Sequence, residues 1–335
     1  MRMLVTGGAG FIGSNFVRYW LRRHAEDHVV AFDLLTYAGN RSSLEDVEDR
    51  IVFVQGDIAD GDFAERVVRE ERVDTIVNFA AESHNSLAVL DPGRFFRTNV
   101  LGTQTLLDVA RATELARFHH VSTCEVYGDL ALDSDDAFTE DHPYRPRTPY
   151  NASKAAADHA VRAYHETYGL PVTITNCSNN YGPYQFPEKV IPLFATHALD
   201  DKPLPLYEAT KNKREWLHVD DHCAAIELVL EQGRVGETYN VGSGVEASID
   251  EIADAILDLT GKPQDLRTIV PDRPGHDRRY LLDSSKLRGE LGWEPKWEFA
   301  DGLADTVRWY TAHREWWEPL KERAPVVESA WLRSS

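Results

Sequence analysis

Cysteine is scarce in this chain, because its 335 residues include only Cys124, Cys177 and Cys223, and these lie far apart in the sequence. Such spacing fits neither a disulfide framework nor the clustered ligands of a structural zinc site. Histidine and acidic residues do not show metal-ligand spacing either. We therefore expect a protein without a bound metal that works in a reducing compartment, the cytoplasm.

Long apolar runs and positive charge are also lacking. No stretch approaches the roughly 20 apolar residues of a membrane-spanning helix, and residues 3–6 have the pattern of a strand instead of a signal peptide. Lys and Arg number 36 against 55 Asp and Glu, and the net charge of −19 disfavours binding to nucleic acids or acidic membranes. The composition predicts a soluble, unexported protein in which any anionic substrate needs a local basic pocket.

Short apolar and β-branched runs alternate with helical patterns through the first two-thirds of the chain. Helical periodicity without an interior proline marks the segments 15–23, 63–71, 100–115 and 151–168. The runs predict strands at residues 4–6, 29–33, 51–54, 75–79, 118–122 and 172–175. This alternation predicts an α/β fold with a doubly wound parallel Rossmann sheet.

The regular alternation ends after Ser178, because five prolines between residues 183 and 205 interrupt the chain. Further on, Ser248 and Glu251 form a capping-box pattern ahead of an apolar helical repeat that ends at Gly261. A chain of 335 residues also exceeds the usual size of one domain. We predict a Rossmann domain of residues 1–178 and 216–243, a smaller C-terminal substrate-binding α/β domain of residues 179–215 and 244–320, and a tail of residues 321–335.

A glycine-rich motif directly follows the first predicted strand and precedes a helix. Gly7, Gly10 and Gly13 permit a tight turn and a close approach of the backbone to a pyrophosphate at the helix N-terminus. Asp33 ends the second predicted strand twenty residues after Gly13, where a carboxylate can hold ribose hydroxyls and repel a 2′-phosphate. The motif therefore predicts NAD as the cofactor in preference to NADP.

Tyr150 and Lys154 stand four residues apart at the start of a predicted helix, so both side chains lie on one face. A lysine ammonium near a phenol favours the phenolate, which predicts that Tyr150 removes a hydroxyl proton during an oxidation. Thr123, at the end of the strand at 118–122, can supply a third hydrogen-bonding group. Taken alone, a Tyr-x-x-x-Lys pair is also typical of an exposed helix face.

Over nearly its whole length the chain resembles the dTDP-glucose 4,6-dehydratase family of extended short-chain dehydrogenases. The GxxGxxG spacing of residues 7–13 is similar to the fingerprint of that wider group. More specific matches lie later in the chain, in segments similar to those that bind the nucleotide diphosphate and sugar in this family. The matching stretches are residues 36–40, 80–84, 125–128, 177–183, 186–189 and 271–280.

The resemblance implies oxidation at sugar C4, loss of water across C5 and C6, and return of the hydride to C6. Thr123, Tyr150 and Lys154 would serve the oxidation, and Glu125 would remove the C5 proton that a C4 ketone makes acidic. The implied assembly is a homodimer formed through the helices at 100–115 and 151–168. Beside the glycines and Asp33, the implied NAD contacts are Phe11, Ile12, Asp57, Ile58, Ala80, Ala81, Tyr150 and Lys154.

The resemblance also implies a nucleoside-diphosphate hexose as substrate, with dTDP-glucose favoured and a UDP-sugar still open. Arginine and lysine suit a diphosphate because they form charge-assisted hydrogen bonds with its oxygens. Tyr207 is expected near the base. The full set of implied substrate contacts is Ser83, His84, Asn179, Asn180, Lys189, Tyr207, Arg214, Asn240, Arg273 and His276.

Two departures from the family pattern fall near the reacting carbons. The family has an aspartate that protonates the departing C6 hydroxyl, but this chain has Cys124, and a thiol with a reference pKa of about 8.5 is a weaker acid. Residues 85–88, Asn-Ser-Leu-Ala, replace the usual Val-Asp-Arg-Ser. Residues 122–128 are instead similar to the 5,6-dehydratase branch of tunicamycin assembly, in which the hydride returns to C4.

Four functions follow from these patterns, and the sequence favours the first of them. They are a 4,6-dehydratase, a 5,6-dehydratase that leaves an exocyclic alkene, a C4 epimerase, and a non-enzymatic NAD-binding sensor. An epimerase needs no base such as Glu125. A sensor has no use for Thr123, Tyr150 and Lys154 together.

Overall fold

The computed structural model describes residues 1–272 and 275–323 of the chain. Its largest layer is a parallel sheet of seven strands in the order β3–β2–β1–β4–β5–β6–β10. All six strands predicted from the sequence lie in this sheet, which confirms the doubly wound α/β fold. The strands are β1 (Arg2–Thr6), β2 (His28–Asp33), β3 (Val52–Gln55), β4 (Thr75–Asn78), β5 (Arg117–Thr123), β6 (Val172–Cys177) and β10 (Thr238–Val241).

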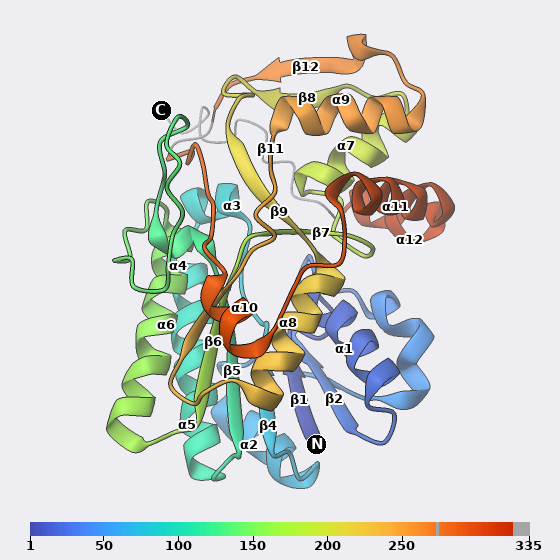
Figure 1. Cartoon of the computed structure of the whole chain (residues 1–335). Coiled ribbons are helices and arrows are strands. Elements are labelled where there is room, and N and C mark those ends of the chain that lie inside the picture. The colour runs from blue at the N-terminus through green and yellow to red at the C-terminus, as the bar shows by residue number, and fades with distance from the viewer. Residues whose placement is uncertain (273–274, 324–335) are drawn as a thin grey trace.

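Helices cover both faces of this sheet (Figure 1). Successive strand residues point to opposite faces, so Val5 packs in one cluster with Trp20 while Leu4 packs in another with Leu106. The first cluster joins the sheet to α1 (Phe11–Arg23) and α8 (Val219–Gln232). The second joins it to α2 (Gly61–Glu70), α5 (Thr103–Ala112) and α6 (Pro149–Tyr168). The 3₁₀ helix η1 (Arg41–Arg50) contacts α1.

The predicted helix at 100–115 differs in the structure, because a π-helical segment precedes α5. This segment, η2 (Phe96–Gly102), follows α3 (Asn85–Leu90) and α4 (Pro92–Phe95). It carries Asn99, whose side chain accepts from the Glu82 N–H and donates to the Glu82 carbonyl and to Ser153 Oγ. The π segment therefore anchors the stretch of backbone that follows β4, and such segments are frequent at functional sites.

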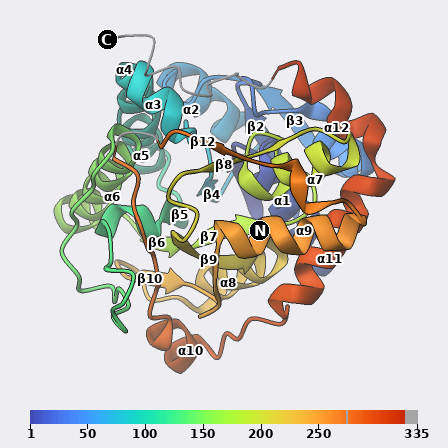
Figure 2. The same ribbon diagram turned by 90° about the horizontal axis from the view of Figure 1, so that it is seen from above.

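A smaller group of elements lies beyond the carboxyl ends of the parallel strands (Figures 1 and 2). The predicted capping box is confirmed, since Ser248 and Glu251 bond reciprocally at the start of α9 (Ile249–Thr260) and Gly261 ends that helix in the left-handed conformation. The strands here are β7 (Asn179–Tyr181), β9 (Lys213–His218) and β11 (Glu246–Ser248), with the pair β8 (Leu204–Tyr207) and β12 (Arg267–Val270). The helices are α7 (Val190–Leu199), α9 (Ile249–Thr260), η4 (Gln264–Leu266), α11 (Phe299–Ala312) and α12 (Arg314–Lys321), while α10 (Ser285–Leu291) contacts α8 and β10.

The proposed residue limits of the two domains stay a prediction. Of the predicted tail at 321–335, residues 324–335 lie outside the described part of the chain. Within residues 1–272 and 275–323, we find no helix with both the length and the apolar character that a membrane crossing requires.

Candidate active site

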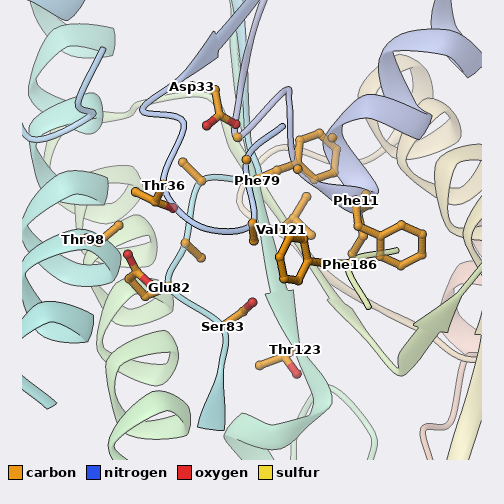
Figure 3. Close-up of a pocket in the computed structure, with 18 of the residues that line it drawn as sticks. Phe11, Asp33, Thr36, Phe79, Glu82, Ser83, Thr98, Val121, Thr123 and Phe186 are labelled. Carbon is orange, nitrogen blue, oxygen red and sulfur yellow. The ribbon is translucent and has the colours of Figure 1, made fainter. Parts of the chain in front are cut away.

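A cavity of about 320 Å³ opens at the carboxyl ends of the central strands. Figure 3 shows Asp33 near one end of this cavity and Thr123 near the other, with Phe79 and Val121 between them. A crevice in this place is where open parallel sheets bind ligands. Every residue predicted to contact the cofactor lines it: Gly7, Gly10, Phe11, Ile12, Gly13, Asp33, Asp57, Ile58, Ala80, Ala81, Tyr150 and Lys154.

The glycine turn forms one wall of the cavity because its backbone is packed too closely for side chains. Gly7 has a φ of +66°, and a Cβ on Gly13 would lie 2.2 Å from the Gly7 carbonyl oxygen. Gly10 caps α1 without a side-chain hydrogen bond. The first turn of α1 thus presents backbone N–H groups and the positive end of the helix dipole, which suit a pyrophosphate.

Asp33 ends β2 beside this turn, and its carboxylate is held by two backbone N–H groups. Oδ2 accepts from Ala9 N at 3.0 Å and Oδ1 accepts from Leu35 N at 2.7 Å. The residue is 7% exposed and lines the cavity. A fixed carboxylate beyond a glycine turn is the arrangement that binds an adenosine ribose, so the residues present fit NAD.

Four of the five predicted catalytic residues line the opposite part of the cavity: Thr123, Glu125, Tyr150 and Lys154. Thr148 caps α6 by accepting from Asn151 N, which places Tyr150 in the first turn and Lys154 in the second. Thr123 ends β5 and accepts from Glu125 N at 3.3 Å, where the 3₁₀ helix η3 (Cys124–Tyr127) begins. A strand end and a helix start thereby bring these side chains together.

The surroundings of Tyr150 act on the pKa of its phenol in two opposite directions. Burial raises the pKa of this phenol well above its ordinary value, and a hydrogen bond with Thr123 opposes the rise. The Lys154 ammonium donates to the Val121 carbonyl at 2.8 Å. Lys154 also lines the cavity, and the hydrogen bond with Thr123 is the interaction that favours the ionised form of Tyr150.

Asp158, one turn beyond Lys154 on α6, provides a counter-charge that the sequence reasoning missed. Its buried carboxylate accepts from Ser122 Oγ at 2.8 Å and Tyr144 OH at 2.9 Å, and lies 3.4 Å from His120 Nε2. Burial, together with the charge of Lys154, lowers the pKa of His120 to about 4. His120 is thus neutral near pH 7, and Lys154 is the buried cation that Asp158 balances. The sequence did carry a signal for Asp158: it stands four residues after Lys154, so the two side chains lie on the same face of the helix.

Cys124 is the predicted catalytic residue that does not line the cavity, although its chain neighbours Thr123 and Glu125 do. It is 1% exposed and packs with Val126, Tyr127, Phe138 and Tyr280 instead of lining the cavity. Burial, with a further effect from the adjacent Glu125 charge, raises the pKa of its thiol well above the ordinary value. The thiol is therefore protonated and held among apolar side chains.

The predicted substrate contacts fall into two groups, of which the first lies at the cavity. Ser83, Asn179, Asn180 and Lys189 line it, and Lys189 Nζ donates to the Ser83 carbonyl at 3.0 Å. His84 caps α3 nearby by accepting from Leu87 N, and its Nε2 lies 3.4 Å from Glu188 Oε2.

The second group does not line the cavity: Tyr207 and Arg214 lie on β8 and β9, and Asn240 lies on β10 of the large sheet. The rings of Tyr207 and His276 meet edge to face at 5.2 Å, and the Arg214 guanidinium lies 4.8 Å from the Tyr280 ring centre. Asn240 is fully buried, where it accepts from Tyr127 OH and donates to the Phe138 carbonyl, and it does not line the cavity. Arg273 lies outside the described residues.

Comparisons with known proteins agree with this geometry. The model of the GDP-mannose 4,6 dehydratase family matches residues 4–306. The dTDP-glucose 4,6-dehydratase of Streptomyces niveus is 50% identical over 327 residues, which cover 96% of each chain. The chain belongs to the dTDP-glucose 4,6-dehydratase family. Membership confirms the predicted enzyme class, a nucleotide-sugar dehydratase and thus a hydro-lyase.

Solved structures of this family superpose on the chain closely. DesIV, the dTDP-glucose 4,6-dehydratase of Streptomyces venezuelae, is solved with NAD and TYD bound. It is 52% identical to this chain and has a TM-score of 0.92. The match covers 96% of this chain and 100% of the DesIV chain. The dTDP-glucose 4,6-dehydratase of Bacillus anthracis, solved with NAD, is 48% identical and has a TM-score of 0.89. The match covers 96% of this chain and 99% of the Bacillus anthracis chain. NAD, the cofactor predicted from the sequence, is thus the cofactor of these relatives.

Sequence reasoning also missed two glutamates that line the cavity of this dehydratase-family chain. Glu188 accepts from Tyr37 OH at 2.9 Å, and burial raises the pKa of its carboxyl. Glu82 accepts from Arg94 Nε at 2.7 Å. The Glu188–Tyr37 pair joins positions 151 residues apart, so no local spacing could have revealed it.

Glu215 of β9 gives a pH-dependent prediction. Its buried carboxylate accepts from Gly244 N at 2.7 Å and Leu282 N at 3.0 Å, and burial raises its pKa to about 7 from 4.5. The folded state therefore retains a proton that the unfolded chain releases, so the stability contributed by this group is lost as the pH rises through 7.

Relative to Glu215→Gln, which does not titrate, the wild-type protein should lose about 3 kcal/mol of unfolding free energy between pH 5 and pH 8. Urea unfolding of both proteins at the two pH values measures this difference. Glu26→Gln, a change at an exposed carboxylate, serves as the control. A wild-type-minus-variant difference that is constant with pH would contradict the assignment.

Proposed function

We propose that the protein converts dTDP-glucose by the 4,6-dehydratase reaction with NAD. The reaction comprises oxidation at C4, removal of the C5 proton, loss of the C6 hydroxyl and reduction at C6. One observation carries the proposal: Thr123, Glu125, Tyr150 and Lys154 line the same cavity as the glycine turn and Asp33. The substrate is taken from the relatives, which are dTDP-glucose 4,6-dehydratases.

NAD, when bound, supplies the acceptor and later the donor of one hydride. The glycine turn and Asp33 would hold it. Tyr150 in its phenolate form accepts the proton of the C4 hydroxyl and becomes a phenol, and the hydrogen bond from Thr123 stabilises the phenolate before that transfer. Lys154 adds a buried positive charge that Asp158 keeps in place, so the phenolate forms in a site that already compensates its charge.

Glu125 then acts on the oxidised sugar. A C4 carbonyl makes the C5 proton acidic, and the Glu125 carboxylate at the cavity wall accepts it. For substrate binding we propose Lys189, Arg214 and His276 for the diphosphate and Tyr207 for the base. Asn180 would also contact the diphosphate, and Ser83, His84 and Asn179 would contact the sugar side. Asn240 is better explained as a buried structural residue, because the groups that bond it lie away from the cavity.

A 5,6-dehydratase is the second candidate, and Cys124 is the observation that favours it. A buried thiol with a raised pKa is a poor acid for a departing C6 hydroxyl. An enzyme that finishes by reducing C4 would leave an exocyclic alkene in place of a C6 methyl group. The C4 epimerase and sensor hypotheses lose support, because neither uses Glu125 beside Tyr150.

Proton NMR of the product tests this proposal. We expect dTDP-glucose to give a C6 methyl doublet and a C4 ketone, with slower conversion of UDP-glucose and UDP-N-acetylglucosamine. Two vinylic protons would instead establish the 5,6-dehydratase. An unchanged mass with inverted C4 would establish the epimerase, and no conversion of any substrate by NAD-loaded protein would contradict an enzymatic function.

We also propose that the protein is a cytoplasmic homodimer with one cofactor-binding and one nucleotide-sugar-binding domain. Leu101 of η2 and Tyr168 of α6 are 57% and 51% exposed, on the two helices predicted to form the dimer. All three cysteines are buried and unpaired, which suits a reducing compartment.

The homodimer is tested by sedimentation equilibrium, which should give twice the chain mass. Leu101→Glu should lower the measured mass to that of the monomer, and a monomeric wild-type protein would contradict the proposal.

A further inference from the structure

Asn85, the first of the residues that depart from the family's usual sequence, contacts the proposed C5 base. Its Nδ2 donates to Glu125 Oε2 at 3.1 Å. Its Oδ1 accepts from Thr148 Oγ1, also at 3.1 Å. Asn85 begins α3, whereas Glu125 lies on η3 and Thr148 caps α6, so one amide joins three elements of the site.

The surrounding groups fix which way this amide points. An ionised Glu125 carboxylate can only accept, so it must face the amide NH₂. Thr148 Oγ1 already accepts from Asn151 N at 3.2 Å, and its own proton remains to be donated to Asn85 Oδ1. Both contacts satisfy the donor and acceptor rules only in the orientation observed.

The amide also relates the two proposed bases to each other. Thr148 caps the helix that carries Tyr150, and Asn85 connects that cap to the Glu125 side chain. On the other side, Thr123 Oγ1 accepts from the Glu125 N–H. Glu125 is thus held through both its backbone and its carboxylate, at a fixed place relative to Tyr150.

We propose that Asn85 is a positioning residue that aims the Glu125 carboxylate at the C5 proton. The valine usual in the family could form neither hydrogen bond, so this chain holds its base by a contact of its own. The inference rests on the proposed function, because it assigns Glu125 to proton removal at C5. A base held in a productive orientation avoids an entropic cost, and misplacing one can slow a reaction by up to about 100-fold.

Asn85→Asp gives the sharpest test because it keeps the shape of the side chain but removes the NH₂ group that donates to Glu125. The new carboxylate would also repel the Glu125 carboxylate. In single turnovers with dTDP-glucose in deuterated water, we expect deuterium incorporation at C5 to slow at least ~10-fold. Reduced nicotinamide should then accumulate, because C4 oxidation continues while C5 deprotonation lags. Asn85→Val should show a similar defect. Binding of dTDP, measured by calorimetry, should not change.

Leu90→Ala is the matched control, since Leu90 is exposed at the far end of the same helix; it should behave as wild type. Unchanged C5 exchange in both Asn85 variants would overturn the inference. So would an equal loss of dTDP binding, C4 oxidation and C5 exchange, which would indicate a merely structural role. If wild-type protein itself neither oxidised C4 nor exchanged C5, the proposed function would fall as well, and the two failures are therefore distinguishable.

Discussion

Tyr150→Phe is expected to lower kcat by about 10³-fold, since the variant lacks the phenolate oxygen that accepts the proton of the C4 hydroxyl. Tyr150 lies in the first turn of α6 at the cavity wall, and its hydrogen bond with Thr123 disappears with the hydroxyl. Substrate binding should change little, because the missing oxygen acts mainly in the transition state. Steady-state kinetics with dTDP-glucose would show the loss in kcat with KM nearly constant.

Tyr164→Phe is the matched control on the same helix. The Tyr164 hydroxyl donates to Asp108 away from the cavity, so its removal should leave kcat within about twofold of wild type, as is usual for peripheral changes. A Tyr150→Phe enzyme that retained most of its activity would show that another group accepts the C4 proton.

Cys124→Asp is expected to speed the loss of the C6 hydroxyl by about 10- to 100-fold. The site is buried and next to Glu125, and both conditions raise the pKa of a carboxyl group. The introduced acid should therefore stay protonated near pH 7 and be able to donate to the departing oxygen. Rapid-quench analysis of the keto intermediates and the final product would measure the change.

Cys124→Ser separates acidity from polarity, since a serine hydroxyl is similar in size to the thiol but is not acidic. It should not accelerate elimination. Equal rates in wild type and Cys124→Asp would show that the thiol is not what limits the step, and would direct attention to the altered segment that begins at Asn85.

The parallel sheet could be predicted from the sequence because each strand is a short apolar run that can be recognised locally. Residues such as Leu4 and Val5 pack on opposite faces of β1, and an apolar run of that kind is stable only in a strand covered on both sides. The glycine turn was equally predictable, because packing forbids a side chain at Gly13. The short strands of the smaller layer, such as β7 and β11, could not be located from so few residues.

The site was predictable where one element fixes several residues and not where distant segments meet. Tyr150 and Lys154 share a helix face, and Thr123 and Glu125 flank one strand end, so both pairs were found. The contact between Asn85 and Glu125 joins positions 40 residues apart. It depends on how α3 packs against η3, which no spacing reveals.

Burial explains why some residues that the sequence analysis assigned to the site do not line the cavity in the structure. The resemblance implied Asn240 at the nucleotide diphosphate and Cys124 among the catalytic residues; both side chains are buried, and neither lines the cavity. The hydrogen bond from the Lys154 ammonium to the Val121 carbonyl was likewise not predictable from the sequence. Desolvation and backbone partners depend on the folded environment, so they are known only once the packing is known.

The fate of the C4 hydrogen tests the central claim most directly. dTDP-glucose labelled with deuterium at C4 should give a 4-keto product with deuterium in the C6 methyl group, because the 4,6-dehydratase reaction moves that hydrogen from C4 to C6 within one turnover. NMR and mass spectrometry of the isolated product locate the label. Deuterium found at C4 of a product with an exocyclic alkene would contradict the account and establish the 5,6-dehydratase.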